Sequence, residues 1–258
     1  MEFQPVESNL RNSFRVVAAH RPGGELREME GVSIASAGVT FQMFNTAFLS
    51  APVATESELE RRITQAAVYY AAREQRWSYW ICHGWLESRT RKRLTQVLRK
   101  RNLHEAVQLP GMLAEHIRQP ERDLPAVDVR RVSSGPVKDA FCDIGSLCFN
   151  VPLSWFCEVF DGEGIWKDFA AWVGYQDGQP VSTAATVIGG DAVGVYNVAT
   201  IPSHRRAGYG EAVMRHAIEQ ARREHGLTRT ILQSTPQGLG LYQRMGYRTV
   251  TTVSVFCS

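Results

Sequence analysis

The sequence lacks several features that would define a class at once. No stretch of 18 apolar residues occurs, which excludes a membrane-spanning helix. The first residues, Met-Glu-Phe-Gln-Pro, lack the basic start and apolar run of a secretion signal. The five cysteines include no CxxC pair, and their odd number does not suit a disulfide framework. A net charge of +3 is too small to indicate nucleic acid by itself. We therefore expect a cytoplasmic chain with reduced cysteines and no metal site.

The composition is that of an ordinary globular protein, with 44% hydrophobic and 21% charged residues among 258. That length suits one large domain or two ordinary ones. The segment Arg-Gln-Pro-Glu-Arg-Asp-Leu-Pro-Ala, residues 118–126, carries two prolines and four charges between patterned segments. We expect a boundary there, with domains at 31–122 and 123–258. Residues 1–30 show no sustained period and are interpreted as a loosely held lead-in segment.

The second half predicts an antiparallel meander followed by one strand–helix–strand unit. Turn residues Asp177-Gly178 and Gly189-Gly190-Asp191 separate three strand patterns. An amphipathic helix is expected over 208–225, with Gly226 as its stop. A strand at 230–233, a short helix at 239–245 and a strand at 247–256 follow. The predicted fold class is α/β (α+β), a mixed, mostly antiparallel twisted sheet flanked by helices.

The most informative segment is the turn that joins the strand ending at Val198-Ala199-Thr200 to this helix. Arg205 and Arg206 bring positive charge to it, and Gly208 and Gly210 allow backbone N–H groups to converge. The start of the helix adds a partial positive charge. Such a turn suits a pyrophosphate, although the same glycines also suit a plain tight turn.

Two other glycine-rich motifs do not fit this segment. The chain contains no GxxxxGK[ST], so a P-loop is excluded. The pattern Gly208-x-Gly210-x-x-Val213 lacks the third glycine of the dinucleotide fingerprint, and no acidic residue ends the next strand. The turn therefore predicts neither a nucleoside triphosphate nor a dinucleotide.

The order strand, R-x-x-G-x-G, helix, strand and then Ser234…Leu241-Tyr242-x-x-Met245-Gly246-Tyr247 closely resembles the GNAT acetyltransferase superfamily. The resemblance covers about residues 126–258. It implies an N-acetyltransferase that moves an acetyl group from acetyl-CoA, as cosubstrate, to a primary amine by direct attack. It also implies the residues that contact CoA, which are Val198, Ala199, Thr200, Arg205, Arg206, Ala207, Gly208, Tyr209, Gly210, Glu211 and Ser234.

The same resemblance assigns Tyr242 as the acid that protonates the departing thiolate, although a packing tyrosine is the simpler alternative. The base for the amine is not visible in the sequence. Candidates on the acceptor side are Glu158, Asp161, Glu163 and His204, although a solvated surface charge is the simpler interpretation of each. Trp155, Trp166 and Trp172 also fall in this region, either as core residues or as contacts to an apolar acceptor.

The first half shows the same order of elements without the phosphate turn. Thr55 and Glu58 form a capping box, and a helical pattern follows them. The strand 77–83, a helix, Asn102 and a strand at 106–117 match the order of 230–256. Pro110 predicts an edge or a bulge in the last of these strands. We interpret residues 31–122 as a degenerate GNAT-like unit, as in tandem members of the superfamily, which does not bind CoA by such a turn.

Residues 89–101 carry seven basic residues and no acid, which indicates a solvated helix face; an acidic partner is the alternative. Two further functional hypotheses stay open. One is a non-catalytic module that senses acetyl-CoA, and the other is an acyltransferase for longer acyl-CoA. The sequence leaves the amine open and fits a monomer or a homodimer.

Overall fold

In the computed structural model, which describes residues 1–162 and 164–258, eleven strands form one sheet. The first half contains these elements: α1 (Gln4–Ala19), β1 (Glu25–Met29), β2 (Val32–Ser36), η1 (Gln42–Phe44), β3 (Asn45–Leu49), α2 (Glu56–Ala71), β4 (Ser78–Cys82), η2 (His83–Trp85), α3 (Ser88–Arg99) and β5 (His104–Ala114). The second half contains β6 (Asp128–Arg131), α4 (Gly135–Phe149), α5 (Leu153–Val159), α6 (Ile165–Asp168), β7 (Ala170–Gln176), β8 (Gln179–Gly189), β9 (Ala192–Thr200), η3 (Pro202–His204), α7 (Tyr209–His225), β10 (Thr230–Gln233), α8 (Leu239–Arg244) and β11 (Arg248–Cys257).

The strand order is β1-β2-β3-β4-β11-β5-β10-β9-β8-β7-β6. All named strand pairs are antiparallel except β3–β4 and β9–β10, which are parallel. Each half therefore contributes an antiparallel meander that ends in one parallel pair. The mixed, mostly antiparallel sheet flanked by helices confirms the predicted fold class.

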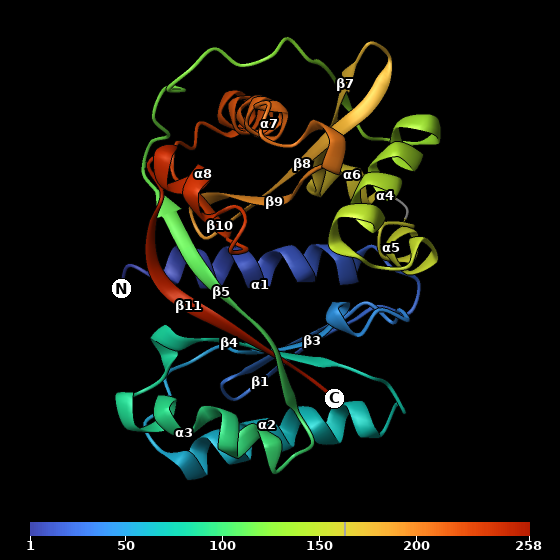
Figure 1. Ribbon diagram of the computed structural model, residues 1–258. Coiled ribbons are helices and arrows are strands. Elements are labelled where there is room, and N and C mark those ends of the chain that lie inside the picture. The colour runs from blue at the N-terminus through green and yellow to red at the C-terminus, as the bar shows by residue number, and fades with distance from the viewer. Residues whose placement is uncertain (163) are drawn as a thin grey trace.

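The two halves exchange their last strands. β5 follows α3 in the first half, yet it pairs with β10 of the second half through Thr230↔Ala114 to Gln233↔Gly111. β11 follows α8 in the second half, yet it pairs with β4 of the first half through Val253↔Cys82 to Cys257↔Ser78. β5 and β11 also pair with each other and run side by side between the two halves (Figure 1). Neither half can complete its sheet alone.

For Pro110 the sequence predicted an edge or a bulge, and this exchange rules out the edge. The strand that contains it is not at an edge, because β5 lies between β11 and β10. Pro110 is paired with Thr252 of β11, whereas the pairing with β10 begins only at Gly111. Pro110, which has no amide N–H, thus lies just beyond the point where the pairing of β5 with β10 ends. The neighbouring strand β11 has a bulge nearby, between Thr249 and Thr251.

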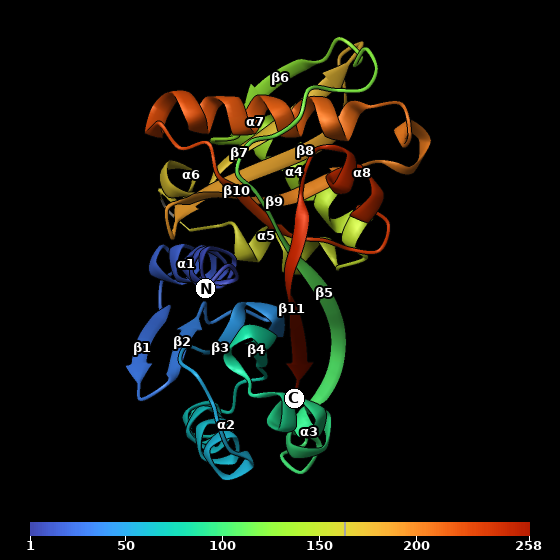
Figure 2. The same cartoon turned by 90° about the vertical axis from the view of Figure 1, so that its left-hand side faces the viewer.

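The expected loose lead-in is wrong for residues 4–19, which form helix α1. Its apolar residues Val6, Leu10, Phe14 and Val17 recur at helical spacing, and all are buried. The buried Asn9 fixes the helix on the second half, because its amide nitrogen donates to the carbonyls of Gly189 at 2.8 Å and Ala192 at 2.9 Å. α1 crosses the molecule between the two sets of helices (Figures 1 and 2).

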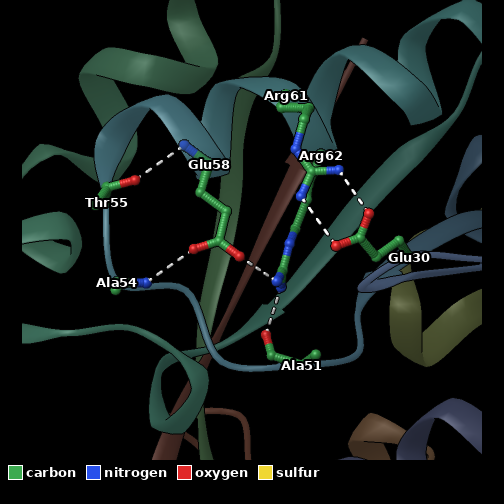
Figure 3. A network of polar contacts seen from close by, with 7 residues as sticks. All are labelled: Glu30, Ala51, Ala54, Thr55, Glu58, Arg61 and Arg62. Atoms are coloured by element: carbon green, nitrogen blue, oxygen red, sulfur yellow. Dashed lines mark hydrogen bonds and ion pairs between the residues drawn. The ribbon is translucent and has the colours of Figure 1, made fainter.

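The capping box predicted at the start of α2 is present in an altered form (Figure 3). The Thr55 hydroxyl accepts from the Glu58 amide at 3.2 Å, but the Glu58 carboxylate accepts from the Ala54 amide instead of that of Thr55. Glu58 also pairs with Arg62, a buried residue that donates to the Ala51 carbonyl at 2.7 Å. The box therefore anchors the loop between β3 and α2 as well as the helix end.

Helices cover both faces of the sheet in the second half. α7 and α8 pack Met214, Ile218 and Met245 against Trp172, Val195 and Leu232. α4 to α6 pack Phe141, Phe160 and Ile165 against Ala171, Val173 and Val187 on the other face. The alternation of Ala171, Trp172 and Val173 between these two clusters follows the period of two in a strand.

Candidate active site

The parallel strands β9 and β10 separate after a short contact. They pair only through Thr230↔Val193 and Ile231↔Gly194, and β9 then continues to Thr200 without a described partner on that side. The register of β9 against β8 shifts between Thr183 and Ala185, and Asn197 takes a left-handed φ of 49°. This bulge interrupts the ladder immediately before Val198, Ala199 and Thr200. We call the unpaired region between β9 and β10 the gap; on that side Val198, Ala199 and Thr200 have no described strand partner, and the bulge at Asn197 directly precedes them.

The turn after β9 brings Arg205 to Glu211 together around the start of α7. Within the described residues, none of the amides from Arg206 to Glu211 donates to a backbone carbonyl; the Ala212 amide is the first to do so, bonding to Gly208 at 2.9 Å. Free N–H groups at the start of a 17-residue helix, with the positive end of its dipole, are suited to bind an anion.

Gly208 and Gly210 serve different purposes in this turn. Gly208 has a φ of +98°, and a Cβ there would lie 2.9 Å from Pro125 Cδ. Gly210 has ordinary φ, but a Cβ would lie 2.8 Å from Thr200 Oγ1. The first glycine permits the turn and the second permits α7 to approach β9 closely.

Several side chains hold β9 and the turn in place. The Thr200 carbonyl accepts from Arg205 Nε at 3.0 Å and from the Cys148 thiol at 3.4 Å. The Thr200 hydroxyl lies 3.0 Å from the Ser182 hydroxyl, which itself donates to the Ala199 carbonyl at 2.7 Å. These contacts explain why small hydroxyl residues stand beside the glycines.

The remaining predicted turn residues divide between framework and surface. Tyr209 is buried and its hydroxyl donates to Gln176. Glu211 is neutralised by Arg215 at 2.8 Å, which removes a negative charge from the neighbourhood of the free amides. Ser234 is fully buried; its amide donates to the Pro110 carbonyl at 2.9 Å and its hydroxyl to the Thr235 carbonyl at 2.7 Å. Ser234 therefore joins β10 to β5, and its hydroxyl is already engaged.

Tyr242 lies in α8 with its ring against Gly238 and inclined by 66° to the ring of Tyr247, with centroids 5.9 Å apart. Burial raises the pKa of Tyr242 to about 12, so it stays protonated at neutral pH. Burial is the one cause of this shift, and no hydrogen bond to another described residue contributes to it. A protonated hydroxyl suits a proton donor.

The candidate bases have different surroundings. The Glu158 carboxylate accepts from the Thr40 amide at 3.0 Å. Lys138 pairs with Asp161 at 2.8 Å and holds the pKa of that carboxyl below its ordinary value. His204 lies beside the turn, with its ring nitrogen 2.9 Å from the Ser203 hydroxyl. Glu163 lies outside the described residues.

The three tryptophans do not form one group. Trp172 is buried against His216, and Trp166 stacks on Phe160 with centroids 5.8 Å apart. Trp155 is 37% exposed on α5, near Phe41 of the first half. Trp155 is thus the most exposed of the three, and Trp166 is half-buried.

The first half contains an equivalent pair of parallel strands, β3 and β4, but this pair is closed, which means that the chain stays paired beyond the ends of the strands. β3 and β4 pair through Thr46↔Ser78 to Phe48↔Trp80, and a further parallel bridge joins Val53 to Leu86. The turn at Asn102, with φ of 57°, corresponds to Gly246, with φ of 97°. The basic helix α3 exposes its charges, and Arg93 and Lys100 pair with Glu56 of α2.

Two cavities lie away from the turn, one of about 610 Å³ on the outer face of α2 and one of about 200 Å³ between α1, α6 and the end of α7. The described residues include no group of three His, Cys, Asp or Glu side chains able to hold a metal ion. No helix in the described part of the chain is long and apolar enough to cross a membrane.

The sequence did not predict that the segment between β5 and β6 contacts the turn before α7. Arg122 Nη2 donates to the Arg206 carbonyl at 3.1 Å, and Leu124 and Pro125 lie against Gly208. The prolines and charges of 118–126 indicated only a linker. Its close packing on the turn depends on the tertiary fold.

Comparisons with known proteins agree with this geometry. Residues 167–249 match the model of the acetyltransferase (GNAT) domain. A GCN5-related N-acetyltransferase from Kribbella flavida has a similar structure, with a TM-score of 0.72 and 20% identity over 98% of this chain and 95% of that one. A putative GNAT acetyltransferase from Novosphingobium aromaticivorans gives 0.58 and 13% over 98% and 97%. No curated protein matched significantly.

The two-unit layout also has a counterpart. A tandem GNAT protein from the clavulanic acid biosynthesis pathway superposes with a TM-score of 0.58 at 9% identity, over 94% of this chain and 87% of that one. The fold is therefore that of the GNAT acetyltransferases, arranged as a tandem. Within the second half, residues 167–249 match the GNAT acetyltransferase domain.

Proposed function

We propose that this protein transfers an acetyl group from acetyl-CoA to a primary amine by direct attack. The observation that carries the proposal is the gap between β9 and β10, which opens beside the free amides of the turn at Arg205–Gly210. The turn offers amides and two arginines to a pyrophosphate. The gap offers the irregular backbone of β9 to the pantetheine arm and to the acetyl carbonyl.

In this proposal the transition state is stabilised by groups of the second half. An amide at Val198 or Ala199, next to the bulge, donates to the developing oxyanion. Tyr242 donates a proton to the departing sulfur, and its raised pKa keeps that proton available. We assign no side chain as base, because Glu158 is bonded to Thr40 and Asp161 to Lys138.

We further propose that residues 123–258 form the catalytic unit and residues 31–122 the degenerate unit. β5 then belongs to the catalytic sheet although it lies before residue 123. The closed pair β3–β4 supports a first half without its own CoA site.

The identity of the acceptor amine can be determined by screening a panel of amines. α4 and α5 expose Leu147, Phe149, Leu153 and Trp155, and α4 contacts Thr200 through Cys148. This placement favours an acceptor with an apolar part near the gap. The screen should therefore contrast aromatic amines with polyamines, amino acids and peptides.

The test is to incubate the full chain with acetyl-CoA and this amine panel, and to detect products by mass. We expect an acetylated amine and free CoA. Binding of acetyl-CoA without product from any amine would favour the alternative of a sensing module. Faster turnover with a longer acyl-CoA than with acetyl-CoA would favour the other alternative. Absence of binding to any acyl-CoA would contradict the proposal.

A further inference from the structure

The segment between β5 and β6, residues 115–127, crosses over α7 (Figure 2). We call it the strap. Its first part is fixed at Arg118, whose amide donates to the Met245 carbonyl at 2.8 Å and whose carbonyl accepts from Arg215 at 2.7 Å. The strap is thereby tied to both α8 and α7.

The last part of the strap lies on the phosphate turn. A Cβ at Gly208 would be 2.9 Å from Pro125 Cδ, 3.3 Å from Leu124 Cδ2 and 3.7 Å from Arg122 Nη2. Arg122 Nη2 also donates to the Arg206 carbonyl at 3.1 Å. The guanidinium of Arg122 therefore lies within one hydrogen bond of the turn, although 83 residues separate Arg122 from Arg205.

Arg122, Arg205 and Arg206 bring three positive charges to this small region. Within the described chain, none of them lies within 4.0 Å of a carboxylate. Arg122 stands between two acidic residues in the chain: Glu121 is directed to Arg244, at 3.9 Å, and Asp123 forms no ion pair among the described residues. Positive charges that lie close together repel one another, and a bound anion would offset this repulsion. The guanidinium group matches phosphate oxygens with two parallel donors.

We propose that Arg122 is a third phosphate-binding arginine of the CoA site and that the strap delivers it there. The inference rests on the proposed function, because it takes the turn at Arg205–Gly210 as the place of the CoA phosphates. CoA has a pyrophosphate and a 3′-phosphate, and both present the same chemistry to a guanidinium. The bond from Nη2 to the Arg206 carbonyl leaves the other donors of the group for a phosphate.

The experiment measures the binding of CoA and of 3′-dephospho-CoA to the full chain by calorimetry. Arg122→Gln should weaken the binding of CoA about tenfold, which corresponds to about 1.4 kcal/mol. Arg122→Lys keeps the charge but loses the paired donors of the guanidinium, and it should recover part of the affinity. Arg99→Gln removes an equally exposed arginine from α3 and is the matched control; it should bind like the wild type.

The two ligands distinguish which phosphate Arg122 contacts. An equal loss with CoA and dephospho-CoA assigns Arg122 to the pyrophosphate, and a loss with CoA alone assigns it to the 3′-phosphate. Unchanged CoA binding in Arg122→Gln overturns the inference while the proposed function stands. Equal losses in the Gln and Lys variants, with a lower melting temperature before ligand is added, would mean that Arg122 only braces the turn and would also overturn it. A wild-type chain that binds neither ligand contradicts the proposed function itself.

Discussion

The amide of Val53 donates to the carbonyl of Trp85 at 2.7 Å, and this bond joins the two chain segments that follow β3 and β4. The Glu87 amide returns to the Val53 carbonyl at 3.1 Å, so the two segments stay paired beyond the ends of the strands. In the second half the corresponding pair β9–β10 has no described pairing beyond Gly194↔Ile231. The same pair of parallel strands is thus closed in one half and open in the other.

This difference predicts one CoA per chain. Opening the first half would break the bonds between Val53, Trp85 and Glu87, and the first half lacks an R-x-x-G-x-G turn. Calorimetric titration of the full chain with acetyl-CoA should give a stoichiometry of one. Two equivalent sites per chain would contradict the closed interpretation of β3–β4.

The second prediction concerns Gly208→Val. A β-branched residue at φ +98° is strained, and its Cβ would push against Pro125 at 2.9 Å, so the turn and the strap must move. Acetyl-CoA at 100 times its dissociation constant should stabilise the wild type by about 2.7 kcal/mol and raise its melting temperature. The variant should lose this rise.

The matched control is Gly178→Val in the hairpin between β7 and β8. Gly178 also has a positive φ, +77°, but a Cβ there would meet nothing within 4 Å. Both variants should melt at lower temperature than the wild type because both are strained, yet only Gly178→Val should keep the rise with acetyl-CoA. A folded Gly208→Val chain with a normal rise would remove the turn from the CoA site.

The third prediction separates an enzyme from a sensor. Tyr242→Phe keeps the ring on Gly238 and removes only the hydroxyl, so the dissociation constant of acetyl-CoA should hardly change. General acids contribute about 10²–10⁴ in rate. A thiolate leaves fairly well without a proton because a thiol has a reference pKa of about 8.5. We therefore expect kcat to fall about 10- to 100-fold.

Tyr247→Phe is the control for this variant. Tyr247 touches the Tyr242 ring, but its hydroxyl is enclosed and has no described partner. Its removal should leave kcat unchanged. Equal kcat in wild type and Tyr242→Phe would exclude the tyrosine from the mechanism, and a loss in both variants would point to packing.

The raised pKa of Tyr242 makes a fourth prediction about pH. Burial favours the protonated form, so the acid should remain available up to a pH of about 12. Wild-type kcat should then show no loss below pH 10 from this group. The free energy of unfolding should depend on pH in the same direction. The contribution of Tyr242 to it is fully present below pH 10, the pKa of a tyrosine in the unfolded chain, and is lost as the pH rises toward 12. A decline of kcat near pH 8 that disappears in Tyr242→Phe would contradict this assignment.

The fifth prediction follows from the strand exchange. A fragment of residues 123–258 lacks β5, whose Met112 and Leu113 are buried beside β10. Burial of each such side chain is worth about 1.5–3 kcal/mol, against a total stability of about 5–15 kcal/mol for a domain. The fragment should show neither a cooperative melting transition nor binding of acetyl-CoA.

A fragment of residues 104–258 restores β5 and is the comparison for the shorter one. We expect it to have more native-like circular dichroism than 123–258 but to remain less stable than the full chain, because α1 and β4 are still missing. If 123–258 binds acetyl-CoA as tightly as the full chain, then β5 is dispensable for the site.

The sequence by itself determined the local elements of the second half and the place of the glycine-rich turn before α7. Gly226 was expected to end a helix, and it caps α7 at φ 72°. Asp177 and Gly178 were expected to make a hairpin, and both take positive φ between β7 and β8. These features depend on residues close together in the chain, where glycine, asparagine and aspartate govern the backbone directly. α1 was missed although Val6, Leu10 and Phe14 already had helical spacing.

Only the tertiary structure decided which half of the sheet β5 and β11 complete, and which residues lie against the turn before α7. The order strand–helix–strand is the same for β4–α3–β5 and β10–α8–β11, so it gives no sign that β5 and β11 change places. Pairing between distant strands depends on the burial of both faces, which no local pattern encodes. For the same reason Arg122 looked like a linker residue, and its bond to the Arg206 carbonyl arises only because the strap folds back across α7.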